Sequence, residues 1–216
     1  MSARDNILAR IRAQQGKPEV PTPEEHTAVD SYIAAHPQSA RPHIAGDLRA
    51  LFRSQALGLA STVEEVAALE AVPQAVAAYL RDGGLPLSAV CWPGFAVLGW
   101  DAAGISAEAR AAHDGDAVGI TGAFCAIAET GTLVLLSGHE TPAAVSLLPE
   151  THIAVVRTSR IVSGMEEAWA LLRAEHRAPP RAVNFVSGPS RTADIEQTVT
   201  LGAHGPYRLH IILLSD

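Results

Sequence analysis

The chain has 216 residues, of which 48% are apolar and 18% are charged, and its formal net charge is −7. This apolar content suffices for a packed core and excludes a globally disordered protein. The negative charge argues against nucleic-acid binding, because phosphate recognition requires gathered lysine and arginine side chains.

The first part of the chain predicts a helical arm that is followed by a linker. Apolar residues recur at helical spacing within residues 3–15, and a glycine and a proline follow them. Residues 17–25 contain three prolines, which predicts an extended segment. A helix this short is marginal in water, so it must dock on the main body or on a partner. We therefore expect an N-terminal helical arm and linker over residues 1–45 and one domain over residues 46–216.

Beyond the arm, short apolar runs alternate with segments of helical spacing. The predicted helices span residues 46–57, 73–81 and 166–175. The predicted strands span residues 59–63, 88–92, 117–121, 133–136, 153–156, 182–186 and 209–214. The strands are continuous apolar runs, which is typical of strands that are buried on both faces. The pattern predicts an α/β fold with a mostly parallel open sheet and helices on both faces.

Three loops next to these strands are rich in small and polar residues, namely 128–132, 187–196 and 201–207. Ligands of open α/β sheets bind beyond the carboxyl ends of the strands, so such loops are where a site is expected. In the second loop, Gly188 permits close approach of the backbone to a ligand, and Ser190 suits the start of a helix. With Thr192 and the permanently charged Arg191, they predict a phosphate or carboxylate cradle at a helix start. An ordinary strand–turn–helix junction explains the same residues.

Three titratable residues of these loops are candidates for chemistry. Glu129 and Glu196 have the carboxylates that a nucleophile or general base requires. His204 titrates near neutral pH and suits an acid, a base or a ligand. Asp194 falls in the first turn of the predicted helix, where a carboxylate complements the helix dipole. A surface location is the simpler interpretation of each residue.

The sequence lacks the common metal and cofactor motifs. Cys91 and Cys125 stand in apolar surroundings, and two cysteines cannot supply the four thiolates of an iron–sulfur cluster. His139 and Glu140 are not followed by the second histidine of a zinc-protease motif. We expect no metal or cofactor on this chain. Because neither a signal peptide nor an apolar run of membrane-spanning length is evident, a cytoplasmic location without a membrane span is expected.

The segments 187–196, 202–206 and 209–214, together with 128–132 and more weakly 4–12, resemble the motifs of the LutC/YkgG family of lactate-utilization proteins, which carry a LUD domain. The resemblance implies candidate catalytic residues, which are Glu129, Glu196 and His204. It also implies candidate ligand-binding residues, which are Thr130, Gly131, Thr132, Ser187, Gly188, Ser190, Arg191, Thr192, Asp194, Gly202 and Gly205.

The same resemblance implies an α/β fold like that of the NagB, RpiA and CoA-transferase enzymes. It further implies a role beside two partner proteins in the oxidation of L-lactate to pyruvate, with the iron–sulfur clusters on those partners. The chain would then be a component without a cluster that binds a small anionic metabolite. The alternatives are a free-standing enzyme or a sensor that binds a phosphorylated or CoA-linked small molecule.

Overall fold

The computed structural model describes residues 2–18, 20–194 and 196–215. Contacts divide the chain into two compact units, Met1–His43 and Ile44–Asp216. The first unit contains α1 (Ala3–Gln14) and α2 (Pro23–Ala35). The helix predicted at the start of the chain is confirmed as α1, whereas α2 lies where only a linker was expected.

Both helices of the first unit begin with a capping box. The Thr22 hydroxyl accepts a hydrogen bond from the Glu25 backbone N–H, and the Glu25 carboxylate accepts one from the Thr22 backbone N–H. Pro23 occupies the first turn, where a missing N–H costs nothing. Glu25 also pairs with Arg12 of α1 at 2.9 Å, which joins the two helices. The proline-rich stretch is thus partly a helix start.

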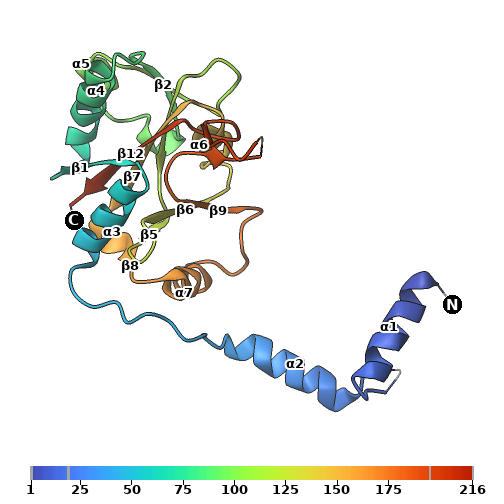
Figure 1. The fold of residues 1–216 in the computed structure, drawn as a ribbon. Helices are drawn as coiled ribbons and strands as arrows, with labels where there is room; N and C mark the ends of the chain where they lie inside the picture. Colours follow the sequence, from blue (N-terminus) through green and yellow to red (C-terminus); the bar gives the residue numbers. More distant parts are fainter. Residues whose placement is uncertain (1, 19, 195, 216) are drawn as a thin grey trace. The chain divides into compact units, whose positions relative to one another are not determined.

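The second unit is built on a six-stranded parallel sheet with the order β1-β12-β7-β4-β2-β3. In this order the strands are β1 (Thr62–Val66), β12 (Arg208–Leu214), β7 (Thr151–Arg157), β4 (Val118–Gly122), β2 (Ser88–Cys91) and β3 (Ser106–Ala109). Figure 1 shows β12 and β7 side by side, with β1 next to β12. The α/β class and the mostly parallel open sheet are confirmed.

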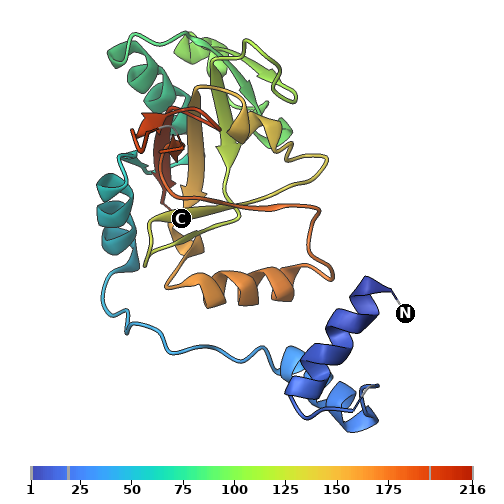
Figure 2. The same ribbon diagram turned by 45° about the vertical axis from the view of Figure 1, so that its right-hand side comes forward.

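Helices lie on both faces of this sheet, as predicted (Figure 2). One face carries α4 (Val72–Asp82) and α5 (Trp100–Ala103), and Leu80 packs in the same core as Ile120. The other face carries α3 (Leu48–Gly58) and α6 (Ala144–Leu147), and Phe52 packs in the same core as Ile211. Short 3-10 helices span Leu69–Ala71, Pro93–Phe95 and Thr158–Arg160.

A second sheet, which was not expected from the sequence, shares the α3 face. Its order is β8-β5-β6-β9, with β8 (Ile161–Val162), β5 (Cys125–Ile127), β6 (Thr132–Leu136) and β9 (Val183–Val186). The strands predicted at 133–136 and 182–186 therefore belong to this sheet and pair antiparallel. Its far side packs against α7 (Met165–Glu175). The central strands are covered on both sides, so their sequences are as apolar as those of a parallel sheet.

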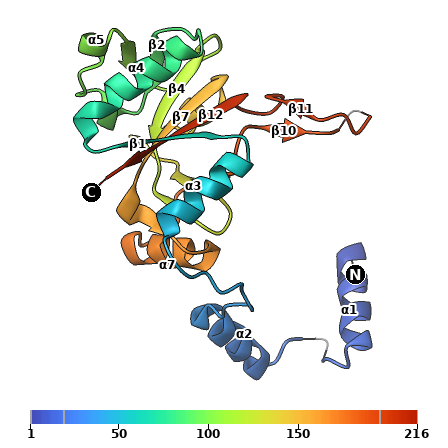
Figure 3. The ribbon, with the colours of Figure 1, turned by 60° about the vertical axis from the view of Figure 1, so that its left-hand side comes forward.

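The strand predicted at 59–63 begins later, because Leu59 caps α3 and Ala60 has a left-handed φ of 64°. The remaining two strands, β10 (Arg191–Thr192) and β11 (Thr200–Leu201), form a separate two-stranded antiparallel sheet just before β12 (Figure 3). In the described part of the chain, each helix is too short or too polar to cross a membrane.

Candidate functional site

Two of the three motif loops meet through a row of hydroxyl groups. Thr132, at the start of β6, and Ser187, which follows β9, lie 2.7 Å apart between their Oγ atoms. Thr130 extends the row, because its Oγ1 lies 2.7 Å from Oγ1 of Thr132. Thr132 is buried, whereas Thr130 and Ser187 are exposed. The buried hydroxyl of Thr132 therefore lies between two exposed hydroxyls, one at each end of the row.

Two motif glycines press against the last turn of α3. Gly131 has a φ of 63°, and a Cβ at this position would lie 2.6 Å from the backbone N of Ala56. Gly188 has a φ of 79°, and a Cβ there would lie 2.5 Å from the carbonyl oxygen of Leu59. Both positions need glycine for backbone conformation and for close approach. The two loops are thus fitted to one helix end.

Arg191 is fixed at the same helix end. Its Nη2 donates a hydrogen bond of 2.6 Å to the carbonyl oxygen of Leu59, the residue that caps α3. The last carbonyls of a helix lack intrahelical donors and carry partial negative charge, so a guanidinium is favourable there. This side chain is exposed, and the bond to Leu59 uses one of its five N–H donors.

The helix predicted to start at Ser190 is wrong for the residues that the structure describes. Arg191 and Thr192 form β10, which pairs with β11. Glu196 and Gln197 adopt left-handed φ values of 52° and 56° in the turn between the two strands, and Ile195 lies outside the described residues. Asp194 consequently has no helix dipole to complement. The anion cradle at a helix start is therefore also wrong, because backbone pairing with β11 overrides the local helix signal.

Ser190 instead connects the second motif loop to the third. Its backbone N–H donates to the carbonyl of Pro206 at 2.9 Å, and its own carbonyl accepts from the N–H of Gly202 at 2.9 Å. Its hydroxyl accepts from the backbone N–H of His204 at 3.3 Å. A Cβ on Gly205 would lie 3.4 Å from Cβ of Ser190, so the packing is close. The two loops form one folded unit.

His204 and Asp194 form a solvent-facing pair on this unit. Their Nε2 and Oδ2 atoms are 3.6 Å apart, and their side chains are 71% and 77% exposed. The pKa of Asp194 is lowered, first by hydrogen bonding with the Thr192 side chain and then by His204. The pair is too exposed for a strong ion pair.

The site lies at the amino ends of the parallel strands, which corrects the expectation for their carboxyl ends. Leu59 precedes β1, and Pro206 precedes β12. The register aligns Arg208 with Thr151, so these strand starts share one edge of the sheet. In Figure 3 the β10–β11 hairpin extends from the beginning of β12, away from the end that leads to the C-terminus.

The family model of the LUD domain matches residues 59–214. The chain belongs to this family. It is 40% identical over 130 residues to lactate utilization protein C of Bacillus subtilis (strain 168) and 38% identical over 130 residues to that of Bacillus licheniformis. Each alignment covers 58% of this chain and 54% of the relative, so the chain spans about half the length of the curated relatives it matches.

A solved structure of a DUF162 family protein from Deinococcus radiodurans has the same fold, with a TM-score of 0.61 and 26% identity. The match covers 80% of this chain and 99% of the other chain. The resemblance to the lactate-utilization family is confirmed by these matches and by the family model. The motif residues described above all lie within the matched LUD domain.

The three candidate catalytic residues of the LUD domain are not brought together. Glu129 is half-buried beside the hydroxyl row, and its backbone N–H donates to the carbonyl of Ser163 at 3.0 Å. Glu196 is exposed in the hairpin turn, and His204 is exposed near Asp194. None of the hydrogen bonds described between residues 2 and 215 joins any two of the three. Shared acid–base chemistry of these side chains therefore has no geometric support.

Within the described residues, no cluster of three or more histidine, cysteine or acidic side chains is placed to hold a metal ion. Cys91 and Cys125 are both buried as free thiols in different core clusters of the LUD domain. Burial raises the pKa of both thiols, that of Cys125 to about 11. Such thiols are protonated and poor metal ligands at neutral pH.

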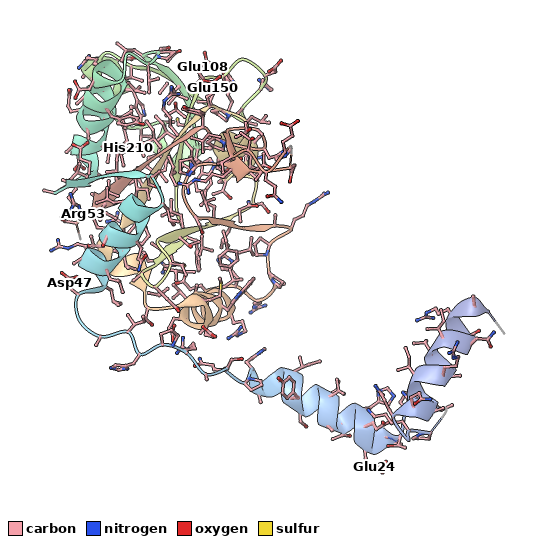
Figure 4. All side chains as sticks on the ribbon, viewed as in Figure 1. Glu24, Asp47, Arg53, Glu108, Glu150 and His210 are labelled. Atoms are coloured by element: carbon pink, nitrogen blue, oxygen red, sulfur yellow. The ribbon has the colours of Figure 1, made fainter. Side chains whose placement is uncertain are left out.

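Two buried histidines were not predicted as special residues. The ring of His210 stacks on Tyr79 at 3.9 Å, its Nδ1 lies 2.8 Å from Oγ1 of Thr62, and Figure 4 shows it beside β1. His152 Nε2 lies 2.7 Å from Oγ1 of Thr121. Burial lowers the pKa of each histidine to about 4. Both histidines lie within apolar strands, β7 and β12. The sequence of such a strand does not indicate whether a polar residue in it is buried.

Proposed function

We propose that this LUD-domain protein takes part in lactate utilization by binding a small carboxylate metabolite. The metabolite binds at the site beside the amino ends of the parallel strands, called the amino-end site below. The observation that carries the proposal is the hydroxyl row of Thr130, Thr132 and Ser187, which joins two family motifs. The relatives named lactate utilization protein C support the metabolic role. The metabolite is L-lactate or its oxidation product pyruvate.

The chemistry of the row suits such a ligand. Each hydroxyl both donates and accepts, so the exposed ends of the row can bond to a carboxylate oxygen or to the hydroxyl of lactate. Arg191, held on Leu59, has further N–H donors in the planar geometry that matches a carboxylate. Gly188 brings the backbone close to the same helix end. The site thus combines neutral hydrogen-bonding groups with one fixed positive charge.

In this proposal the chain itself carries no redox group. L-Lactate loses two electrons and two protons when it becomes pyruvate, and the electrons pass to iron–sulfur clusters on partner proteins. Two buried thiols in separate core clusters do not fit a cluster of the common four-thiolate type. This chain would hold the metabolite or bring the partners together.

The alternative function, an independent enzyme or sensor for a phosphorylated or CoA-linked molecule, is less well supported. It rested on the fold resemblance and on the anion cradle at a helix start near Ser190, which was expected to hold a phosphate or a carboxylate. The backbone N–H of Ser190 is already bonded to the carbonyl of Pro206, and no helix begins there within the described residues. A phosphate group would have to rely on Arg191 and the hydroxyls alone.

The proposal is tested by a thermal-shift titration of the full chain with L-lactate, pyruvate, inorganic phosphate and coenzyme A. A ligand that binds only the folded state stabilises it by about 2.7 kcal/mol at a concentration of 100 times its dissociation constant. We expect a saturable rise in melting temperature with lactate or pyruvate. A rise with coenzyme A or phosphate alone would favour the alternative, and no rise with any of the four would contradict a metabolite site on the isolated chain.

Ser187→Ala tests the hydroxyl row directly. One exposed end of the row is lost, and we expect the dissociation constant for pyruvate to rise roughly 10- to 150-fold, since a hydrogen bond to a charged group contributes about 1.5–3 kcal/mol. Ser106→Ala, at an exposed serine of β3, is the matched control and should leave binding unchanged. Equal affinities of the two variants would show that the row does not touch the ligand.

Arg191→Lys separates charge from geometry. Lysine retains the positive charge and can reach the Leu59 carbonyl, but it lacks the planar fork that binds a carboxylate through two bonds. We expect weaker binding of pyruvate with little change in the melting temperature of the free protein. Arg173→Lys, at an exposed position of α7, should change neither quantity. If Arg191→Lys bound pyruvate with full affinity, the planar guanidinium of Arg191 would not bind the ligand.

A further inference from the structure

A second candidate site lies at the carboxyl ends of the parallel strands, opposite the amino-end site. A cavity of about 390 Å³ opens where β2 and β4 end. Trp92 follows β2 directly, and Ala123 and Phe124 follow β4, so the carboxyl ends of both strands contribute to the lining. Small-molecule sites typically enclose roughly 300–1,000 Å³, so the volume is sufficient for a ligand larger than lactate.

The topology places this cavity at the switch point of the sheet. The chain leaves β2 through α5 toward β3, and it leaves β4 through the second sheet and α6 toward β7. β3 and β7 lie on opposite sides of the β4–β2 pair, and the two connections cover opposite faces. The strand order reverses at such a point, and the loops separate to leave a crevice for a ligand.

The walls of the cavity are mainly aromatic and aliphatic. Trp92, Phe124 and Leu136 all line the cavity. The exposed ring of His176 meets the ring of Phe124 edge-on, with 5.7 Å between the ring centroids. The indole N–H of Trp92 is already bonded to the carbonyl of Pro142, so this ring offers the cavity its apolar surface. Aromatic walls favour a flat ring, which can stack on them or meet their edges.

Two exposed arginines stand next in sequence to lining residues of the cavity, although the chain as a whole has a net charge of −7. The connection between α7 and β9 contributes His176, Ala178 and Pro180 to the lining. It also contains Arg177 and Arg181, which are both exposed. Because both arginines directly adjoin lining residues, their positive charges can attract an anionic group at the mouth and add to the binding of the ring.

We propose that this cavity binds an aromatic or heteroaromatic ring that carries an anionic group. The ring lies among Trp92, Phe124 and Leu136, and the anionic group points to the rim formed by the connection of α7 and β9. Because the cavity and the hydroxyl row are at opposite edges of the sheet, this site does not depend on the proposed function. Each can be lost while the other remains.

The test uses anilinonaphthalene sulfonate, a fluorescent aromatic anion, with the full chain. We expect saturable binding of one probe molecule per chain. Ala178→Phe fills the cavity from an exposed wall position and should weaken binding about tenfold. Ala170→Phe, at an exposed alanine of α7 outside the lining, should bind the probe as the unaltered chain does. Equal binding by both variants, or no saturable binding at all, would overturn the proposal.

The charge requirement is tested with uncharged phenylnaphthylamine as a second probe. A double variant, Arg177→Gln with Arg181→Gln, should weaken the sulfonate about threefold, as expected for exposed charges, and leave the uncharged probe unaffected. The loss should shrink at high salt because ions screen the rim. An unchanged affinity for the sulfonate, or equal weakening of both probes, would contradict the anionic part of the ligand.

Discussion

Replacing Gly131 with alanine is expected to lower the free energy of unfolding by about 2–5 kcal/mol. Two costs add at this position. The left-handed φ of 63° is unfavourable for any residue with a Cβ, and that atom would lie 2.6 Å from the backbone N of Ala56. The obstacle is helix backbone, which cannot rotate away. Urea denaturation, with the midpoint and the slope both recorded, measures the change.

Gly122→Ala is the matched control for this prediction. A Cβ at Gly122 would lie 3.5 Å from the rings of Phe95 and Trp92, which is ordinary contact, and φ there is not left-handed. Its free energy of unfolding should remain within about 1 kcal/mol of the unaltered chain. Equal stabilities of the two variants would show that the turn before β6 does not press on α3. The amino-end site would then lack its support.

Lowering the pH from 7.5 to 5 is expected to reduce the free energy of unfolding by about 2 kcal/mol for each of His152 and His210. The pKa of each is about 4 in the folded chain and has an ordinary value of 6.5 when the chain unfolds. The unfolded state therefore binds more protons between these values. The contribution of these two histidines to the free energy of unfolding is fully present above pH 6.5 and decreases as the pH falls toward 4. Below pH 4 these groups cause no further decrease.

Urea denaturation of His152→Asn at both pH values tests this prediction. Asparagine can still bond to Thr121 but does not titrate, so the loss between pH 7.5 and 5 should shrink by about 2 kcal/mol, whatever the stability at neutral pH. His139→Gln, at a side chain that is 98% exposed, should retain the full loss. The same pH dependence in both variants would mean that His152 titrates normally in the folded state.

Much of the fold follows from the sequence because its central strands are long apolar runs. β7 and β12 are buried along almost their whole length, which is the condition under which such a run indicates a parallel sheet. The second sheet could not be separated from the first, because β5 and β6 are buried to the same degree between other layers. The strand β3 was missed because it is mostly exposed and contains no long apolar side chain.

The motifs marked the residues that we propose for the candidate site, but they did not show how those residues are assembled. The bond from Arg191 to Leu59 spans 132 residues of sequence, and the bond between Thr132 and Ser187 spans 55. Local signals contain no information on such pairings. They favoured a helix after Ser190, whereas pairing with β11 determines the structure there. The cavity beside Trp92 depends likewise on strand order, which no single motif encodes.

The most direct test of the amino-end metabolite site is amide chemical-shift mapping of the nitrogen-labelled full chain during titration with pyruvate. We predict saturable shifts at Thr130, Thr132, Ser187 and Arg191, with the resonances of Trp92 and Phe124 unchanged. Shifts confined to the cavity beside Trp92 and Phe124, or no saturable shifts anywhere, would contradict the assignment of the metabolite to the hydroxyl row.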